Sequence, residues 1–427
     1  MKRKIYFVGI KGTGMSGLAI IYKNLGYDVV GSDVEKKFFT EDSILKNKIK
    51  IYNGFSIENI KKEMPIDFAI TSNAWTSNVE TIFLKENGIK VLTYPEAVSL
   101  IFNNSFGIAI CGTHGKSTTT AFLGKIFEIS NLKTTVLVGS PVKDWESNVY
   151  FSGSDYFILE ADEYKNAFLN YKPKIIILTS LDYDHPDFFK TKKEYKESFI
   201  KFFRKLTGPK ILISYHKFKL PKIKQIKLKY NPKIKFDFYA PGEHWQKNLQ
   251  LVYKFCDIFE KKFKIENFKN NFFLALKEFK GVKRRFDILS ENPILVDDYG
   301  HHPKELISFY NSLKLKFKNK NIYLIFQPHT YSRTEALFEE FKNAFKKIKN
   351  LIIFKTFSSA REGENKEIEL KIKKLKNEIG FKYFDDREKL KEFLIKKIKR
   401  IKNIVIATCG AGDIYEILEE IKGIKNK

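Results

Sequence analysis

Short apolar runs alternate with segments of helical spacing through the first hundred residues. The runs KIYFVGI, DVVGSD, DFAITSNA and KVLTY have the length and the β-branched and aromatic content of buried strands. A Gly-rich turn and a helical pattern follow the first run. Because strands that alternate with helices are typical of a parallel α/β sheet, we expect a first α/β domain over residues 1–102.

The same alternation returns twice further along the chain. A second cycle begins at Phe106 with GIAICGTHGKSTTTAFLGKIF, which has the order strand, loop, helix, and strand-like YFILEAD and KIIILTSLDYDHP follow it. Between 205 and 280 the pattern weakens into Lys-rich strands and a Phe-rich helix. NIYLIFQPH, NLIIFKTFS and NIVIATCGAGD then alternate with helices again, which favours another doubly wound sheet. We therefore predict three α/β domains: a Rossmann-like first domain, a central domain over 103–291 with a mostly parallel sheet, and a Rossmann-like last domain over 292–427.

Composition agrees with several folded domains and argues against a membrane protein. The 427 residues exceed the size at which one core normally keeps growing, and 43% of them are hydrophobic. No apolar stretch approaches the length that spans a bilayer, and the first residues run directly into a strand without a signal-like segment. Cys111, Cys256 and Cys409 have no paired spacing for zinc or a disulfide framework. We expect a cytoplasmic protein.

The net charge of +27 allows two interpretations. Clustered basic side chains attract nucleic acids. Lysine, however, is used along the whole chain, including ordinary amphipathic helices such as 389–402, whereas arginine, the residue of guanidinium-based recognition, is scarce. We therefore predict no nucleic-acid partner and expect the charge to favour anionic substrates.

The strongest single motif is a glycine-rich loop between an apolar strand and a helix. Glycines let backbone N–H groups approach a phosphate, the helix N-terminus adds partial positive charge, a lysine reaches the β- and γ-phosphates, and a serine hydroxyl can ligate Mg²⁺. The strict Walker spacing would need glycine at Ile110, so the loop is shortened; the alternative is a glycine-rich turn with a chance Lys-Ser. The residues predicted to bind nucleotide are Gly112, Thr113, His114, Gly115, Lys116, Ser117 and Thr118.

Acidic and imidazole side chains follow two later strands. Glu160 ends one strand, and His185 follows another with Asp182, Asp184 and Asp187 around it. In an open α/β sheet the carboxyl ends of the strands share an edge with the phosphate loop, so these groups can converge on a metal–nucleotide complex. Each alone also fits a helix cap or a turn. Together with the loop they predict a magnesium site.

The first domain holds a second glycine-rich loop. Gly12, Gly14 and Gly17 give a literal G-x-G-x-x-G between a strand and a helix, and Asp33 ends the next strand. This dinucleotide fingerprint supports an alternative, a nicotinamide-dependent oxidoreductase. Nothing downstream offers a hydride-transfer constellation, and the loop at 112–118 is unexplained on that hypothesis.

Eight motifs in one order resemble those of the Mur ligase family over nearly the whole chain. They are GIKGTGMSGLA, GTHGKSTTT, EADEY, LDYDHPD, VKRRFDIL, VDDYGHHPKE, QPHTYSRT and CGAGDI. The phosphate loop alone would also fit folylpolyglutamate synthases.

The resemblance implies an enzyme that uses ATP and Mg²⁺ to join L-alanine to the lactyl carboxylate of UDP-N-acetylmuramate through an acyl phosphate. It implies that the central domain binds ATP and that the last domain closes over both substrates. GTGMSGLA in place of GTFMGGLA favours addition of alanine over addition of a murein tripeptide, and a non-enzymatic binding module would need a vestigial Lys116 loop. The first domain would bind the UDP sugar rather than NAD, through Gly12, Thr13, Gly14, Met15, Ser16 and Asp33.

The resemblance also assigns roles to the motif residues. Lys116 would stabilise the transferred γ-phosphate, and Ser117, Glu160 and His185 would hold magnesium, so that Lys116, Glu160 and His185 form the catalytic set. In the later motifs, Arg285 and Asp298 match positions that contact ATP, and His329 and Arg333 match positions near the incoming amino acid.

One segment departs from the family pattern. The family usually has His-Asn and a second Asn at the adenine, whereas here Trp245 stands between His244 and Asn248. Asn248 is retained as a nucleotide-binding candidate, and an indole can stack on a purine. Two pairs have alternative interpretations: His301-His302 as a cap of the helix that begins at Pro303, and Arg284-Arg285 as a surface pair.

Overall fold

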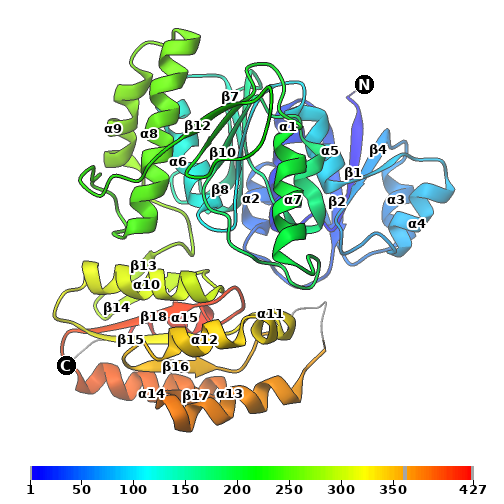
Figure 1. The fold of residues 1–427 in the computed structure, drawn as a ribbon. Coiled ribbons are helices and arrows are strands. Elements are labelled where there is room, and N and C mark those ends of the chain that lie inside the picture. The colour runs from blue at the N-terminus through cyan, green and yellow to red at the C-terminus, as the bar shows by residue number, and fades with distance from the viewer. Residues whose placement is uncertain (1, 359–362, 425–427) are drawn as a thin grey trace. The chain divides into compact units, whose positions relative to one another are not determined.

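The computed structural model describes residues 2–358 and 363–424, which fall into two compact units. The first unit contains the residues up to 181 together with 196–231 and 248–281. The second contains 182–195, 232–247 and the chain from 282 onward. Figure 1 shows the chain from its blue N-terminus to its red C-terminal part. Three sheets run through the two units, two in the first and one in the second.

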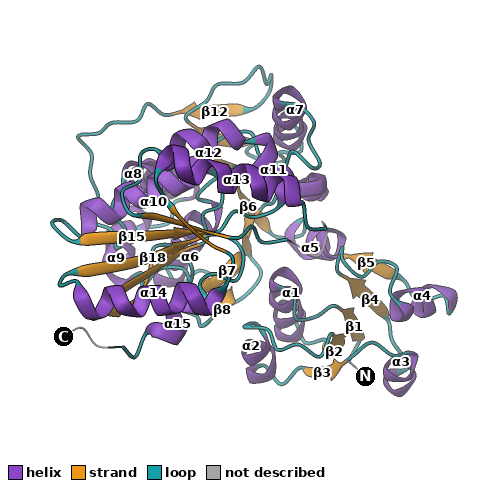
Figure 2. Cartoon of the chain, turned by 90° about the horizontal axis from the view of Figure 1, so that it is seen from below, coloured by secondary structure: helices purple, strands orange, loops and turns teal. Residues whose placement is uncertain are grey.

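A five-stranded parallel sheet forms the first domain, with strand order β3-β2-β1-β4-β5. Its central strand β1 is almost entirely buried because helices cover both faces; Figure 2 shows α1 and α2 on one side and α3 and α4 on the other. The strands are β1 Lys4–Val8, β2 Asp28–Asp33, β3 Lys50–Asn53, β4 Phe68–Thr71 and β5 Val91–Thr93. The helices are α1 Thr13–Asn24, α2 Glu41–Lys46, α3 Ile57–Glu63, α4 Val79–Glu86 and α5 Tyr94–Phe102.

A seven-stranded sheet follows, with order β12-β11-β10-β6-β9-β7-β8, and only its edge strand β8 is antiparallel to its neighbour. Edge-to-face and tilted contacts between phenylalanine rings join α6 to α8 and α9 on one face. The strands are β6 Phe106–Cys111, β7 Thr134–Val142, β8 Ser147–Phe151, β9 Tyr156–Glu160, β10 Ile175–Leu178, β11 Ile211–Ser214 and β12 Lys224–Lys227. The helices are α6 Lys116–Ile129, the 3-10 helix η1 Tyr164–Asn170, α7 Lys192–Phe203, α8 Glu243–Phe263 and α9 Phe268–Glu278.

The third sheet has six strands in the order β13-β14-β18-β15-β16-β17, all parallel except β13. The strands are β13 Asp287–Glu291, β14 Ile294–Asp298, β15 Asn321–Phe326, β16 Leu351–Phe354, β17 Lys382–Phe384 and β18 Ile404–Cys409. The helices are α10 Pro303–Lys316, α11 Tyr331–Ala336, α12 Phe338–Phe345, α13 Lys366–Ile379, α14 Arg387–Arg400 and α15 Glu416–Ile421.

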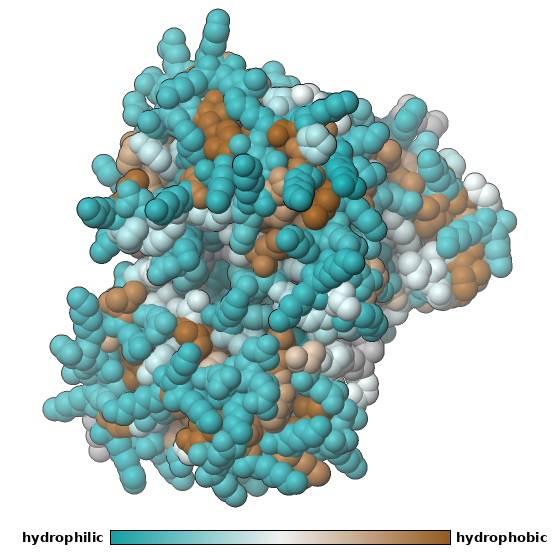
Figure 3. All heavy atoms as spheres, viewed as in Figure 1, coloured by the Kyte–Doolittle hydropathy of each residue, from teal (hydrophilic) through white to brown (hydrophobic). Residues whose placement is uncertain are grey.

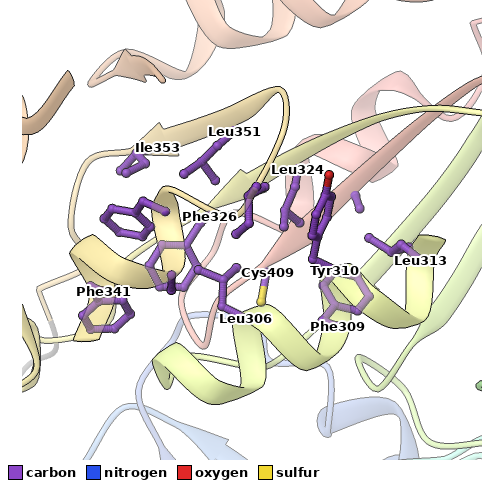
Figure 4. Packing of buried hydrophobic residues seen from close by; sticks show 14 of the residues in the cluster. Leu306, Phe309, Tyr310, Leu313, Leu324, Phe326, Phe341, Leu351, Ile353 and Cys409 are labelled. Atoms are coloured by element: carbon purple, nitrogen blue, oxygen red, sulfur yellow. The ribbon is translucent and has the colours of Figure 1, made fainter. Parts of the chain in front are cut away.

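The two faces of this last sheet are covered by different helices. Side chains of α10, α12 and α13 pack on one face, and those of α14 and α15 pack on the other. Figure 4 shows the first of these cores, where Leu306 and Phe309 of α10 lie against Phe326 of β15 and Cys409 of β18. A sheet buried on both faces needs near-continuous apolar strands, which is what NIYLIF and IVIATC supply.

The face of the molecule in Figure 3 is mostly hydrophilic, with small separate hydrophobic patches. Among the described helices, none combines the length and the apolar character needed to span a membrane. The predicted fold class is confirmed: there are three α/β domains, and their sheets are parallel apart from one strand in each of the last two.

Candidate active site

The first glycine-rich loop leaves the start of α1 open to a ligand. Gly12 precedes the helix, and no side chain caps its first N–H groups. Ser16 instead turns inward and donates from Oγ to the carbonyl of Thr13 at 2.9 Å, and Met15 is buried. Because uncapped N–H groups at a helix N-terminus favour negative charge, this end of α1 suits an anion such as a diphosphate.

Asp33, at the end of β2, holds the loop in place through hydrogen bonds to its backbone. Its carboxylate accepts the backbone N–H of Lys11 at 2.6 Å and that of Val34 at 2.8 Å, and only 4% of the residue is exposed. Burial raises the pKa of Asp33, and the two N–H donors partly offset that effect. Lys11 lies fully buried beside it, with its ammonium 2.8 Å from Asn53 Oδ1 and 3.1 Å from Glu41. The sequence carries no signal for this role of Lys11, because nothing in a lysine next to a glycine indicates burial.

Two side chains from later elements press against the same loop. A Cβ on Gly14 would lie 2.8 Å from the ring of Tyr94, the first residue of α5. A Cβ on Gly17 would lie 2.6 Å from Nδ2 of Asn148 in β8. That amide donates to the carbonyl of Thr13 at 2.7 Å and to Val138 of β7 at 3.2 Å. The β7–β8 hairpin of the second domain is thereby hydrogen-bonded to the loop of the first.

The second glycine-rich loop, between β6 and α6, is shaped by its backbone. Gly112 and Gly115 have φ values of +130° and +80°, which residues other than glycine rarely adopt. Ser180, after β10, braces the loop by accepting the Thr113 N–H through its carbonyl and the His114 N–H through Oγ. The amide of Asn248 in α8 lies against Gly115. Thr118 is buried in the first turn of α6.

Lys116, the first residue of α6, is held by the carboxylate of Glu163, which is not among the predicted site residues. Its ammonium lies 2.9 Å from Glu163 Oε2 and donates to the carbonyl of Gly112 at 2.6 Å, and the Glu163 side chain is fully buried. Burial works against the charge of Lys116, but the carboxylates of Glu163, Asp162 and Glu160 outweigh it and raise its pKa. The lysine is therefore a fixed cation at the loop. EADEY contained the signal, since Glu163 follows the strand that pairs with β6.

Ser117 and Glu160 form a pair of hard oxygen donors beside this lysine. The Ser117 hydroxyl donates to Glu160 Oε1 at 2.8 Å, and the N–H of Gly139 in β7 donates to Oε2 at 2.6 Å. Hydroxyl and carboxylate oxygens next to a phosphate loop are what Mg²⁺ prefers, so the two residues fit a magnesium ion. Glu160 in turn connects the loop to β7, whose Val138 carbonyl binds Asn148.

In the second unit, a buried ion pair joins Asp184 to Arg333. Arg333 Nε lies 2.9 Å from Asp184 Oδ1, and both residues are less than a tenth exposed. His329 lies beside them, with its Nδ1 3.3 Å from Arg333 and its ring stacked on Phe357. Burial opposes ionisation of Asp184, but Arg333 outweighs it and holds the pKa of the carboxyl well below its usual range. His301 completes the cluster, and burial, followed by the charge of Arg333, lowers its pKa to about 3, so that the ring is neutral at pH 7.

Arg284 and Arg285 are both partly buried, so neither is a fully exposed surface residue. Arg284 is ion-paired with Asp297 at 2.9 Å and donates to the carbonyls of Gly410 and Gly412, which makes it part of the scaffold. Both guanidinium groups lie over the ring of Tyr299, that of Arg285 at 5.0 Å and that of Arg284 at 5.1 Å from its centroid.

Asp298 accepts the N–H groups of Phe286 and Gly300, and burial raises its pKa to about 6 although Arg285 partly offsets this. His302 caps α10 by accepting the Lys304 N–H, as one of the two interpretations of that pair held.

Trp245 and His185 both belong to the second unit. Trp245 is 5% exposed and packs in the core of the second unit with Phe238 and Tyr239, so its indole has no open face for a purine. His185 also belongs to the second unit, next to Asp184, with a left-handed φ of +56°. Its role as a metal ligand stays a prediction.

Three family models match consecutive parts of the chain. They are described as the Mur ligase family, catalytic domain, over residues 4–105; the Mur ligase middle domain, over 110–273; and the Mur ligase, glutamate ligase domain, over 284–412.

Relatives and solved structures agree with these matches. The chain is 32% identical to a UDP-N-acetylmuramate–L-alanine ligase of Desulfitobacterium hafniense over 98% of this chain and 99% of that one. It is 33% identical to the ligase of the same name from Borreliella burgdorferi over 96% and 95%. The crystal structure of a UDP-N-acetylmuramate–alanine ligase from Thermotoga maritima superposes with a TM-score of 0.75 at 24% identity, covering 98% and 97%. A murein peptide ligase from Psychrobacter arcticus has a TM-score of 0.69 at 19% identity, with 98% of both chains covered.

Proposed function

This chain belongs to the Mur ligase family, and on that premise we propose that it uses ATP to join L-alanine to the lactyl carboxylate of UDP-N-acetylmuramate. In this proposal residues 1–102 bind the UDP sugar, 103–291 bind ATP, and 292–427 bind the amino acid. The family supports ATP-dependent ligation in peptidoglycan synthesis, and the two relatives at 32% and 33% identity support alanine as the amino acid.

The observation that carries the proposal is the presence, in one compact unit, of two glycine-rich loops that present different polar groups to an anion. The loop at α1 offers the backbone N–H groups of an uncapped helix N-terminus, whereas the loop at α6 adds the Lys116 ammonium and the Ser117–Glu160 pair. A nicotinamide-dependent oxidoreductase needs one nucleotide loop and would leave the second without a use. A ligase that activates a bound sugar nucleotide with ATP needs both.

The reaction needs charge stabilisation more than a protein nucleophile. A carboxylate is a poor acyl donor until one of its oxygens becomes a leaving group, and transfer of the γ-phosphoryl group of ATP achieves this by forming an acyl phosphate. Lys116, kept protonated by Glu163, exchanges part of its present hydrogen bonding for the phosphate oxygens on which negative charge develops. The amine of alanine then attacks the acyl carbon, and inorganic phosphate leaves.

We propose that Ser117 and Glu160 hold a magnesium ion, with His185 as a predicted third ligand. When bound, the ion would neutralise phosphate charge. Glu160 is already oriented for this role, because its second oxygen is fixed by the Gly139 N–H. Arg333, fixed by Asp184, supplies a positive charge for the carboxylate of the amino acid.

Phosphate release from Mg-ATP tests the proposal directly. The purified protein is assayed with UDP-N-acetylmuramate, with and without L-alanine, and the product is identified by mass. We expect release only when both substrates are present, with one alanine joined per phosphate. Replacing alanine by the murein tripeptide, and following NADH formation in a parallel reaction with NAD, separates the alternatives.

Each alternative has its own signature in that experiment. Release that requires the tripeptide would select a recycling ligase for the same sugar nucleotide. NADH formation without phosphate release would select an oxidoreductase. No turnover with any of these substrates would contradict the proposal.

A further inference from the structure

Tyr94, the first residue of α5, stands at the first glycine loop. A Cβ on Gly14 would lie 2.8 Å from Cζ of Tyr94 and 3.0 Å from its hydroxyl oxygen, so the phenol reaches the first turn of α1. Among the described residues, no hydrogen bond to that hydroxyl is formed, and the side chain is partly exposed. A polar group next to an uncapped helix N-terminus is thus left available.

The buried tyrosines of this domain, unlike the partly exposed Tyr94, use their hydroxyls within the protein. Tyr22 donates to the carbonyl of Ala97 at 3.0 Å, and Tyr6 donates to Glu80 at 3.1 Å. Buried polar groups are normally paired in this way. Tyr94 is the contrasting case, although it begins the same helix that holds Ala97.

The backbone around Tyr94 is held firmly. Thr93 and Glu96 form a reciprocal capping box at the start of α5, with Glu96 Oε2 accepting the Thr93 N–H at 2.8 Å and its hydroxyl at 2.7 Å. Pro95 follows Tyr94 directly and fixes the first turn. The phenol is therefore placed by a rigid element rather than by a mobile loop.

Charge near the ring keeps the hydroxyl a donor. Burial raises the pKa of Tyr94, and the nearby carboxylates of Glu160 and Asp162 raise it further. A phenol that stays protonated donates a hydrogen bond to an anion and does not repel it. Glu160 ends β9 and accepts a hydrogen bond from the Ser117 hydroxyl, so the carboxylate that acts on the Tyr94 phenol also contacts the second loop.

We propose that Tyr94 is a substrate-positioning residue whose hydroxyl donates a hydrogen bond to a diphosphate oxygen of the bound uridine nucleotide at the N-terminus of α1. This inference rests on the proposed function, because it takes the first loop as the site of the UDP sugar. It also explains why position 14 is a glycine: a side chain there would collide with the ring of Tyr94.

The test compares the affinity of UDP and uridine for the full-length protein and for Tyr94→Phe, by calorimetry and by competition. Removing one hydrogen bond to a charged acceptor should weaken UDP binding about tenfold. Uridine, which lacks phosphate, should bind both proteins equally. The KM for UDP-N-acetylmuramate should rise by the same factor, while the KM for ATP stays within about twofold because one hydrogen bond is lost at one site only.

Tyr22→Phe is the matched control, because it removes a hydroxyl that is already paired. It should lower the melting temperature and leave UDP affinity unchanged, whereas Tyr94→Phe should leave the melting temperature unchanged. Equal UDP affinity in wild type and Tyr94→Phe would overturn the inference while leaving the proposed function intact. Equal loss of uridine and UDP binding would also overturn it. Failure of the wild-type protein to bind UDP would instead contradict the proposed function.

Discussion

The loops at 12–17 and 112–118 share the order strand, glycines, helix, but their glycines serve different ends. In the second loop Gly112 and Gly115 have positive φ values, so glycine is required by the backbone itself. In the first loop Gly14 and Gly17 lie in the first turns of α1, and glycine is required because Tyr94 and Asn148 approach them.

The two loops also differ in where they place their lysine. Lys116 lies at the helix start with Glu163, beside the Ser117–Glu160 pair. Lys11, directly before the first loop, is buried, and its ammonium is paired with the Glu41 carboxylate. The same backbone pattern therefore offers partial charges for binding at one place and a full charge for phosphoryl transfer at the other. A glycine fingerprint by itself identifies a place for an anion, and the adjacent side chains decide whether chemistry occurs there.

Replacing Lys116 by alanine should give the largest separation of the two loops. We expect phosphate release to fall by about 10³-fold, because a preorganised charge in the transition state is lost. UDP affinity should stay within about twofold, since the first loop keeps its own donors. Coupled phosphate detection and calorimetry measure the two effects.

Lys125→Ala, on the same helix, is the control and should retain phosphate release. Because Lys116→Ala leaves Glu163 buried without its partner, the double variant Lys116→Met/Glu163→Gln should show the same loss with normal stability. Equal loss of UDP binding and phosphate release would contradict the division of labour between the loops.

Arg333→Ala tests whether the amino acid binds at a third site, separate from the two glycine-rich loops. The guanidinium lies in neither loop, so we expect the KM for L-alanine to rise about 10- to 100-fold, the range for hydrogen bonds to a charged group. The KM values for ATP and the UDP sugar should change little. Steady-state kinetics with each substrate varied in turn measures this, and an effect confined to ATP would move Arg333 to the nucleotide.

Gly14→Ala tests the steric origin of the first fingerprint. A methyl group 2.8 Å from the Tyr94 ring is overpacked, so the free energy of unfolding should fall by about 1–3 kcal/mol. Gly12→Ala should cost much less, since its nearest neighbour would lie at 3.6 Å. Denaturant titrations of both variants, and of Gly14→Ala/Tyr94→Ala, measure the coupling. Equal destabilisation by Gly14→Ala with and without the Tyr94 ring would refute the steric explanation.

Asn148→Ala tests the hydrogen bonds that link the two loops. We expect the free energy of unfolding to fall by about 1 kcal/mol and the KM for the UDP sugar to rise about threefold, because the Thr13 carbonyl loses a donor. Asn24→Ala, which removes a bond to Ile20 within α1, serves as the control and should affect stability only. An unchanged KM in Asn148→Ala would mean that the hairpin supports the fold without orienting the loop.

The smallest expected effect is the pH dependence contributed by Asp33. Burial raises its pKa in the folded state, so the folded protein takes up this proton at a higher pH than the unfolded chain. The contribution of Asp33 to stability therefore grows as the pH falls through the folded-state pKa and is lost as the pH rises through it. As the pH falls from 7 to 4, the unfolding free energy of the wild type should increase relative to that of Asp33→Asn. Urea titrations across that range measure it; a constant difference would exclude the titration of Asp33 as its source.

The local pattern predicted the fold class well because strands, loops and helices follow one another along the chain. It identified the 112–118 loop for the same reason. The local pattern could not predict contacts between distant segments. Tyr94 is 80 residues from Gly14 along the chain, and Asn148 is 131 residues from Gly17. Hydrophobic periodicity reports which face of an element is buried, whereas the neighbours across that face depend on strand order. Trp245 shows the same limit, since the motif could not indicate that its indole packs in a core.

The hairpin of β7 and β8 bears on how this enzyme can be recombined with others. Strand order along the chain suggests a seam near residue 103, but α1 packs on β7 and β8, and Asn148 fills the space that Gly17 leaves. A chimera that exchanged only the first domain would set a foreign helix against this hairpin. A transplantable first module therefore has to include residues 134–151 or match their surface, which makes the functional unit of exchange discontinuous in the gene.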